Sequence, residues 1–207
     1  MRIITISREF GSGGRELGRR LSDLLEYEYF DREIIGAIAK NRGMDEAYVE
    51  KMLENQSWKG IPLHYRSSIS GNTALQRSKT SLLLEERQVI EAIARAGKDC
   101  VIVGRSAGAL LRDYRPFRLF VTADLDIRVR RCMERAGKDE QLSHREMERK
   151  IRGIDKNRAQ MHELIAGSAW GERNAYHLTV NTSDWDIKQL APAVAEFAIR
   201  WFERKLE

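Results

Sequence analysis

Three glycines within residues 11–14 constrain the fold of this chain more than any other feature. A β-branched run at 3–6 precedes them, and a segment with helical periodicity at 14–26 follows. This change of pattern across a glycine-rich turn predicts a buried strand, a tight loop and a helix. A loop of this kind presents free backbone N–H groups at a helix N-terminus, where the helix dipole favours an anion.

The glycine loop matches known nucleotide-binding patterns only in part. Counting from Gly11, the third glycine of the dinucleotide pattern G-x-G-x-x-G falls on Glu16, so that pattern is absent. The phosphate-loop pattern G-x-x-x-x-G-K-[ST] fits better if Gly13 is its second glycine. Arg8 then stands at the first glycine and Gly14 at the lysine.

We predict that the loop binds phosphate in spite of the missing lysine, with the backbone of Gly11, Gly13 and Gly14 curling around phosphate oxygens. Arg15 stands at the Ser/Thr position of the pattern and would supply the positive charge one residue after the position of the usual lysine. Ser12 would offer a hydroxyl, and Glu16 would help to hold magnesium through water. The alternative is a glycine-rich turn that only packs a helix on a strand.

Strand and helix patterns alternate along the rest of the chain, and several strands lack polar alternation. Such strands are typical of a parallel sheet with helices on both faces. The 207 residues suit a single domain spanning 1–207. The segment 56–80 is the most loop-like, and Ser81 is a plausible N-cap for the helix that follows. Further strands are predicted at 27–30, 100–105, 118–123 and 177–182, and helices at 31–43, 44–56, 81–96, 107–112, 124–136, 143–166 and 184–206.

Composition narrows the classes of partner. The net charge is +5, but basic and acidic residues are interleaved, so RNA binding is the weakest hypothesis. Met1 and Arg2 lead directly into the first strand, and no apolar run approaches the ~20 residues of a membrane span, so we expect a cytoplasmic protein. The cysteines and histidines show no metal-ligand spacing, and His64 and His162 are interpreted as ordinary histidines.

Four further segments, "EYEYFDREII", "CVIVGRSAGALL", "DKNRAQ" and "YHLTVNTS", follow the glycine loop in an informative order. Together with the loop they resemble the cytidylate kinase-like family, a branch of the nucleoside monophosphate kinases. The resemblance runs from Ile3 to about Trp201 and is weak over 44–80. It implies a three-layer P-loop kinase fold with a parallel five-stranded sheet. It also implies a helical acceptor-binding insertion over roughly 40–80 and a lid over roughly 136–155.

The same resemblance implies roles for particular residues around the acceptor. The glycine loop, 11–15, would wrap the phosphates of ATP. Asp31 matches an aspartate near the acceptor, and Arg105 matches an arginine that contacts the acceptor nucleotide. Ser106 stands where the family has an aspartate that helps to read cytosine, a departure that bears on cytidine specificity.

Arginines of the lid would close over the transferring phosphoryl group, because phosphoryl transfer needs alignment and cations more than covalent chemistry. Arg131, Arg152 and Arg158, with Asp155 beside them, are the lid candidates, and Arg15 completes the predicted catalytic set. Two structural alternatives stay open. The arginines could form solvated helix faces paired with nearby glutamates, and Asp31 could simply cap the next helix.

The leading hypothesis is therefore a kinase that uses ATP and Mg²⁺, the metal arriving with the nucleotide rather than through direct side-chain ligands. The acceptor would be a nucleoside monophosphate or a similar small phosphorylated or nucleoside molecule. The second hypothesis is a nucleotide-binding or sensing protein with weak or no transfer, which the missing lysine would explain. The apolar closing helix at 184–206 could pack on its own core or form a homodimer contact.

Overall fold

The computed structural model describes residues 1–46, 49, 72–136 and 142–204, with the backbone alone for 72–80. Its centre is a sheet of five strands in the order β2-β3-β1-β4-β5, and every neighbouring pair is parallel. The predicted parallel five-stranded sheet is thereby confirmed. The strands are β1 (Ile3–Arg8), β2 (Glu28–Phe30), β3 (Cys100–Val103), β4 (Phe117–Thr122) and β5 (Leu178–Asn181).

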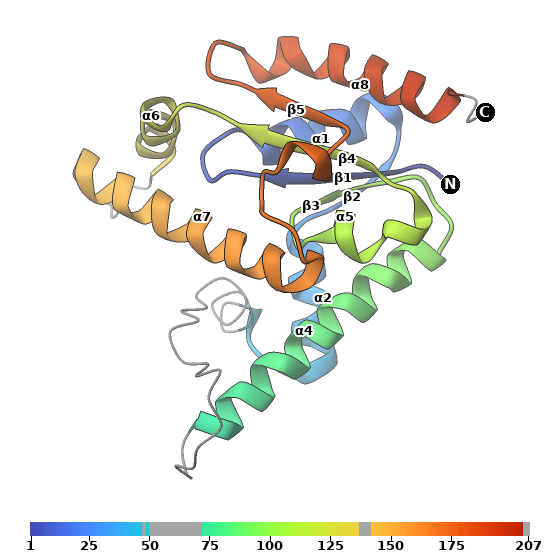
Figure 1. The fold of residues 1–207 in the computed structure, drawn as a ribbon, viewed down its shortest axis with the longest axis vertical. Helices are drawn as coiled ribbons and strands as arrows, with labels where there is room; N and C mark the ends of the chain where they lie inside the picture. The colour runs from blue at the N-terminus through green and yellow to red at the C-terminus, as the bar shows by residue number, and fades with distance from the viewer. Residues whose placement is uncertain (47–48, 50–71, 137–141, 205–207) are drawn as a thin grey trace.

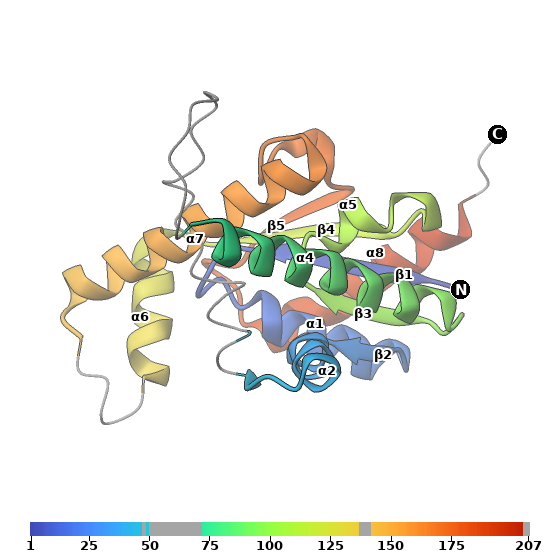
Figure 2. The same cartoon turned by 90° about the horizontal axis from the view of Figure 1, so that it is seen from below.

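Helices cover both faces of the sheet, as the alternating pattern predicts (Figure 1). Helices α1 and α8 pack on one face, and α2, α4 and α5 pack on the other. Helices α6 and α7 pack against each other, and Figure 2 shows this pair at one end of the molecule. Their bounds are α1 Gly14–Leu25, α2 Arg32–Arg42, α4 Asn72–Arg95, α5 Ala107–Leu110, α6 Leu125–Arg135, α7 His144–Ala166 and α8 Ile187–Glu203.

The two faces explain why the central strands carry apolar residues on both of their sides. Successive residues of a strand point to opposite faces, so Ile3 enters one core while Ile4 and Ile6 enter the other. Neighbouring strands repeat this division, with Ile102 on the first face and Val103 on the second. Both layers remove apolar surface from water, which favours the sheet over any arrangement that exposes one face.

The sequence prediction was wrong about the start of α4. This helix begins at Asn72, so residues 72–80 are helical rather than loop, and Ser81 lies inside the helix instead of capping it. The segment 72–95 contains no glycine or proline, and the buried apolar residues of its second half anchor a helix that continues into a polar stretch. Most of the predicted helix at 44–56 lies outside the described residues.

Two other predicted regions are described only in part. The insertion at 40–80 is described at both its ends, and the lid at 136–155 is described at 136 and from 142 into α7. The start of α7 carries a capping box, with the Glu146 side chain accepting a hydrogen bond from the Ser143 N–H at 2.9 Å. Among the described helices, none has the length and apolar character that crossing a membrane requires.

We expect close packing between α1 and the sheet to make Gly18 intolerant of any side chain. A Cβ at Gly18 would lie 2.7 Å from Cγ2 of Val103 and 3.1 Å from Cδ1 of Ile6, both in the core. Gly18→Ala should lower the free energy of unfolding by about 1–3 kcal/mol through overpacking. Urea unfolding measures the change.

Gly153 on α7 is the matched control, because a Cβ there would meet no atom within 4 Å. Gly153→Ala should raise the free energy of unfolding by about 0.5–1 kcal/mol, the usual gain from replacing a helical glycine. Equal stabilisation by both substitutions would contradict the close approach of α1 to β3.

Candidate active site

The glycine loop lies between the end of β1 at Arg8 and the start of α1 at Gly14 (Figure 1). Gly13 is the N-cap of α1 with φ near +82°, and no side chain caps this helix terminus. Gly11 has φ near +80°, a backbone conformation that side chains with a Cβ rarely adopt. The N–H groups of the first helical turn have no intrahelical partners, so the loop offers them to an anion.

The three glycines are also required by packing. A Cβ at Gly11 would lie 2.9 Å from Sγ of Cys132 in α6, and a Cβ at Gly13 would lie 2.8 Å from Cδ1 of Ile187 in α8. A Cβ at Gly14 would lie 2.6 Å from Cβ of Arg8. A lysine at Gly14, the position that the sequence pattern matches to the phosphate-loop lysine, would therefore clash with Arg8.

Beside the loop lies a cavity of about 330 Å³, which we call the loop cavity. Its lining is rich in cations, because basic side chains from β1, α1 and α7 reach it together with the loop backbone. The combination of glycine backbone and guanidinium groups suits a polyanion. The residues that define it here are Arg8, Gly11, Gly13, Gly14, Arg15 and Arg158.

Asp31 lies at the N-cap position of α2, but its buried side chain forms no cap hydrogen bond. Its carboxylate instead pairs with two arginines of the loop region. Nη2 of Arg8 lies 3.5 Å from Oδ1, and Nε of Arg15 donates a short hydrogen bond to Oδ2. The side-chain cap is thus not formed, and the structure brings Asp31 and Arg15, two of the residues singled out from the sequence, into contact.

Arg8 is the residue of this site that sequence reasoning missed. Burial, together with Arg158, lowers the pKa of its guanidinium to about 9, and Arg105 and Arg15 add to the repulsion while Asp31 opposes it. Arg8 stays protonated at neutral pH, so the site holds a desolvated cation among other cations. The signal was present in the sequence: an arginine ends an otherwise apolar strand at the carboxyl edge of a parallel sheet, where ligands bind.

The turn after β3 is strained. Gly104, Arg105 and Ser106 all have positive φ, near +84°, +60° and +51°. For residues with a Cβ this conformation is costly and tends to persist at functional sites. The turn places Nε of the mostly buried Arg105 3.5 Å from Oε1 of Glu86, an ion pair too long for a strong hydrogen bond.

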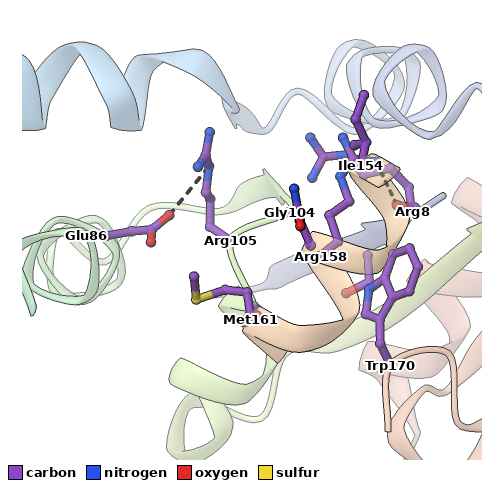
Figure 3. A pocket seen from close by; sticks show the side chains of 11 residues that line it. Arg8, Glu86, Gly104, Arg105, Ile154, Arg158, Met161 and Trp170 are labelled. Atoms are coloured by element: carbon purple, nitrogen blue, oxygen red, sulfur yellow. Dashed lines mark hydrogen bonds and ion pairs between the residues drawn. The ribbon is translucent and has the colours of Figure 1, made fainter. Parts of the chain in front are cut away.

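A second cavity of about 70 Å³, the arginine cavity, opens where this turn faces α7 (Figure 3). Figure 3 shows Arg8, Arg105 and Arg158 around it, with Met161 and Trp170 on the α7 side. Nη1 of Arg158 donates to the Arg8 carbonyl at 3.1 Å, which holds α7 against the end of β1. Ser106 lines the same cavity, so three predicted site residues, Arg105, Ser106 and Arg158, meet here.

Two other predicted residues brace the loop from outside. Asp155 accepts a hydrogen bond from the Phe10 N–H at 2.8 Å and pairs with Arg128 at 2.5 Å. Arg131 donates to the carbonyl of Thr182 at 2.8 Å and lies 3.4 Å from the carbonyl of Ser12. Both side chains therefore fix the loop in position.

Arg152 is not brought into this group. Its exposed side chain pairs with Glu148 at 2.9 Å along α7, the helix-face arrangement considered as an alternative.

Ser12 and Glu16 differ in their suitability as helpers for a metal. The Ser12 hydroxyl is buried and donates to the carbonyl of Glu9 at 2.9 Å, so it turns into the loop. The Glu16 carboxylate is partly exposed and pairs with Arg20 and Arg135 at 3.0 Å each. Among the described residues, no group of three His, Cys, Asp or Glu side chains could hold a metal by itself.

Comparison with known proteins places the sequence beside one protein family. The model of the cytidylate kinase-like family matches residues 3–184. The cytidylate kinase of Haloarcula marismortui is 27% identical over 185 residues, which cover 89% of this chain and 82% of the relative.

Solved structures agree in fold. A protein from Eubacterium ventriosum has a TM-score of 0.70 at 20% identity, covering 96% of this chain and 99% of that one. Shikimate kinase from Acinetobacter baumannii has a TM-score of 0.57 at 16% identity, covering 100% and 96%. The predicted P-loop kinase-like fold is thereby confirmed.

A lysine introduced at Gly14 should lower the thermal stability of this protein. Gly14→Lys places a Cβ against Cβ of Arg8 and 3.3 Å from Cβ of Val121, so we expect a lower melting temperature. Adding Arg8→Gly removes the closest contact, so the double variant should be more stable than the sum of the two single effects. Thermal unfolding of the three variants measures this coupling, and simple additivity would show that Arg8 does not exclude the lysine.

Proposed function

The chain belongs to the cytidylate kinase-like family, and from that membership we propose that it transfers a phosphoryl group from ATP to a nucleoside monophosphate or a similar small phosphorylated acceptor. The observation that carries the proposal is the desolvated Arg8 guanidinium, which lies among Arg15, Arg105 and Arg158 at the carboxyl edge of the sheet. A bound phosphate would relieve their mutual repulsion.

The donor phosphates would lie in the loop cavity. Backbone N–H groups of the glycine loop and the N-terminus of α1 provide fixed positive ends of dipoles, and Arg15 adds a charge at the first helical turn. These donors are held before ligand binds, because α6, α7 and α8 pack around the loop. Preorganised donors of this kind favour the charge that develops during transfer.

The acceptor phosphate would lie in the arginine cavity. Arg8, Arg105 and Arg158 offer more cationic groups than a single carboxylate would need, and guanidinium forks match the geometry of phosphate oxygens. Arg8 and Arg158 line both cavities. They are therefore the side chains that would neutralise the phosphoryl group as it passes from donor to acceptor.

Asp31 is a positioning residue in this proposal. It touches neither cavity through a free oxygen, because its carboxylate pairs with Arg8 and Arg15. Asp31 pairs with Arg8, which lines both cavities, and with Arg15, which lines the loop cavity. It thereby sets the spacing between the arginines that would bind the donor phosphates and those that would bind the acceptor phosphate. Alignment of this kind accounts for much of the catalysis in phosphoryl transfer, where the protein supplies little covalent chemistry.

Magnesium would arrive on the ATP phosphates and supply charge neutralisation for the transfer. Of the two helpers predicted from the sequence, the partly exposed Glu16 carboxylate suits the role, in place of one of its arginine partners. Ser12 does not suit it in this structure, because its hydroxyl is engaged inside the loop. Arg131, Arg152 and Asp155 keep their predicted lid roles only as a proposal.

The relatives' name favours cytidine monophosphate as the first acceptor to test. Ser106 lines the arginine cavity at the position where the family's aspartate helps to read cytosine, so other monophosphates belong in the same panel. Shikimate, which carries a carboxylate and no phosphate, is the informative negative acceptor.

A nucleotide-binding protein without turnover is the second candidate. One observation favours it: Gly14 leaves no room for the lysine that normally accompanies transfer. ATP binding measured by titration calorimetry, with no ADP release for any acceptor in the panel, would establish this second function.

For the kinase, we expect acceptor-dependent ADP release from ATP and Mg²⁺ that falls by about 100-fold or more in Arg8→Met, the usual loss when one charge-stabilising donor is removed. Arg200→Met, on an exposed side chain of α8, is the control and should leave turnover unchanged. The melting temperature of Arg8→Met without ligand should not fall, because a desolvated and repelled charge is removed while Asp31 keeps its ion pair with Arg15. Release that is unaffected by Arg8→Met would sink the proposal.

A further inference from the structure

A third cavity, of about 200 Å³, lies beneath the sheet beside the arginine cavity. We call it the inner cavity. It is enclosed by β1 and β4, by α5, by the C-terminal end of α7 and by the segment that leads from α7 to β5, which Figure 1 shows close to one another. Ser7 lines both the inner and the arginine cavity, but the polar groups described below belong to the inner cavity alone.

Two side chains that line this cavity, the buried His162 and the half-buried Tyr176, carry unpartnered polar atoms. His162 is 6% exposed, and neither of its ring nitrogens forms a hydrogen bond. Its ring stacks on Tyr176 with centroids 6.3 Å apart, and the buried Tyr176 hydroxyl also lacks a hydrogen bond. Ser7 and the backbone of Gly171 lie beside that hydroxyl without reaching hydrogen-bond geometry. Buried polar groups of this kind are nearly always satisfied, so each requires an explanation.

Two arginines add positive charge to the same wall. Nε of Arg118 is buried and unpartnered, and burial together with Arg112 lowers the pKa of Arg118. Within the described part of the chain, neither arginine forms an ion pair with a carboxylate. Glu172 is the acidic residue of the lining, and it is exposed at the rim. Burial also lowers the pKa of His162, so its neutral ring offers one N–H donor at pH 7.

We propose that the inner cavity is a binding site for a small oxyanion, distinct from the sites of phosphoryl transfer. Nε of Arg118, the ring nitrogens of His162 and the Tyr176 hydroxyl are unpartnered and belong to residues that line one cavity, whose acidic side chain, Glu172, is exposed at the rim, so the complementary ligand is rich in acceptors and negatively charged. The small residues Gly108, Ala109 and Ala166 leave room for a compact molecule. Inorganic phosphate and a small carboxylic acid share this chemistry, and the experiment below separates them.

The site can be tested through His162 itself. The ring ¹H and ¹⁵N resonances of the histidines are followed while the protein is titrated with inorganic phosphate and, separately, with malonate. We expect saturable shifts at His162 and none at the exposed His144. A response to phosphate alone assigns a phosphate-class ligand, and a response to malonate alone assigns a carboxylate. No saturable shift with either anion overturns the proposal.

Variants decide which cavity binds the anion. Arg118→Met should abolish the His162 response, whereas Arg105→Met, which alters the arginine cavity, should leave it intact. The opposite pattern would mean that the anion binds only in the arginine cavity, and the proposal would fail. The test needs neither ATP nor turnover, so its failure is separate from failure of the proposed kinase activity.

Tyr176→Phe keeps the test decisive if Arg118→Met does not fold. This substitution removes only the unpartnered hydroxyl and leaves the ring contacts with Phe120 and His162. The free variant should therefore melt no lower than the parent. Its apparent Kd for the anion should rise about tenfold, the loss of one hydrogen bond to a charged ligand. An unchanged Kd would show that the hydroxyl faces no ligand.

Discussion

The site depends on Arg8, a mostly buried cation at the end of the central strand. Arg8 fills the space beside Gly14 and Gly104, where a Cβ atom would meet its side chain. A Cβ at Gly104 would lie 1.7 Å from its Nη1, and a Cβ at Gly14 would meet its stem. Asp31 is buried beside it as counter-charge. Desolvating a guanidinium among other cations lowers the stability of the folded state. Anion binding is a physical reason for retaining such a residue, because a bound anion would neutralise these cations.

The shape of the glycine loop is set by parts of the chain far from it. The Phe10 N–H donates a hydrogen bond to Asp155 of α7. The carbonyl of Ser12 accepts a hydrogen bond of 2.6 Å from the hydroxyl of Thr182, which directly follows β5. Arg131 joins Thr182 to α6. Rigid packing of this kind keeps the backbone donors aimed at one point before any anion arrives, which is what electrostatic stabilisation requires. Arg131 and Asp155, predicted as lid residues, contribute in this structure by holding the loop.

Local patterns predicted most of the fold. The alternation of apolar runs and helical periodicity gave the five strands and their parallel arrangement, because strands that are buried on both faces cannot show polar alternation. The start of α4 was missed because residues 72–80 are polar, and only packing further along the helix supports them. His162, interpreted as an ordinary histidine, is buried with both nitrogens unpartnered, which no local pattern reveals.

The sequence alone determined the strand, glycine loop and helix, since the positive φ values at Gly11 and Gly13 are a conformation that residues without a Cβ atom adopt readily. It also placed Asp31 and Arg105 at the carboxyl ends of their strands. Only the tertiary structure decided that Arg8 would be buried against Asp31, and that Arg158 would reach the end of β1 from a helix 150 residues later in the chain. Such contacts join segments that meet only when the parallel sheet brings its carboxyl ends to one edge, so periodicity and spacing could not specify them.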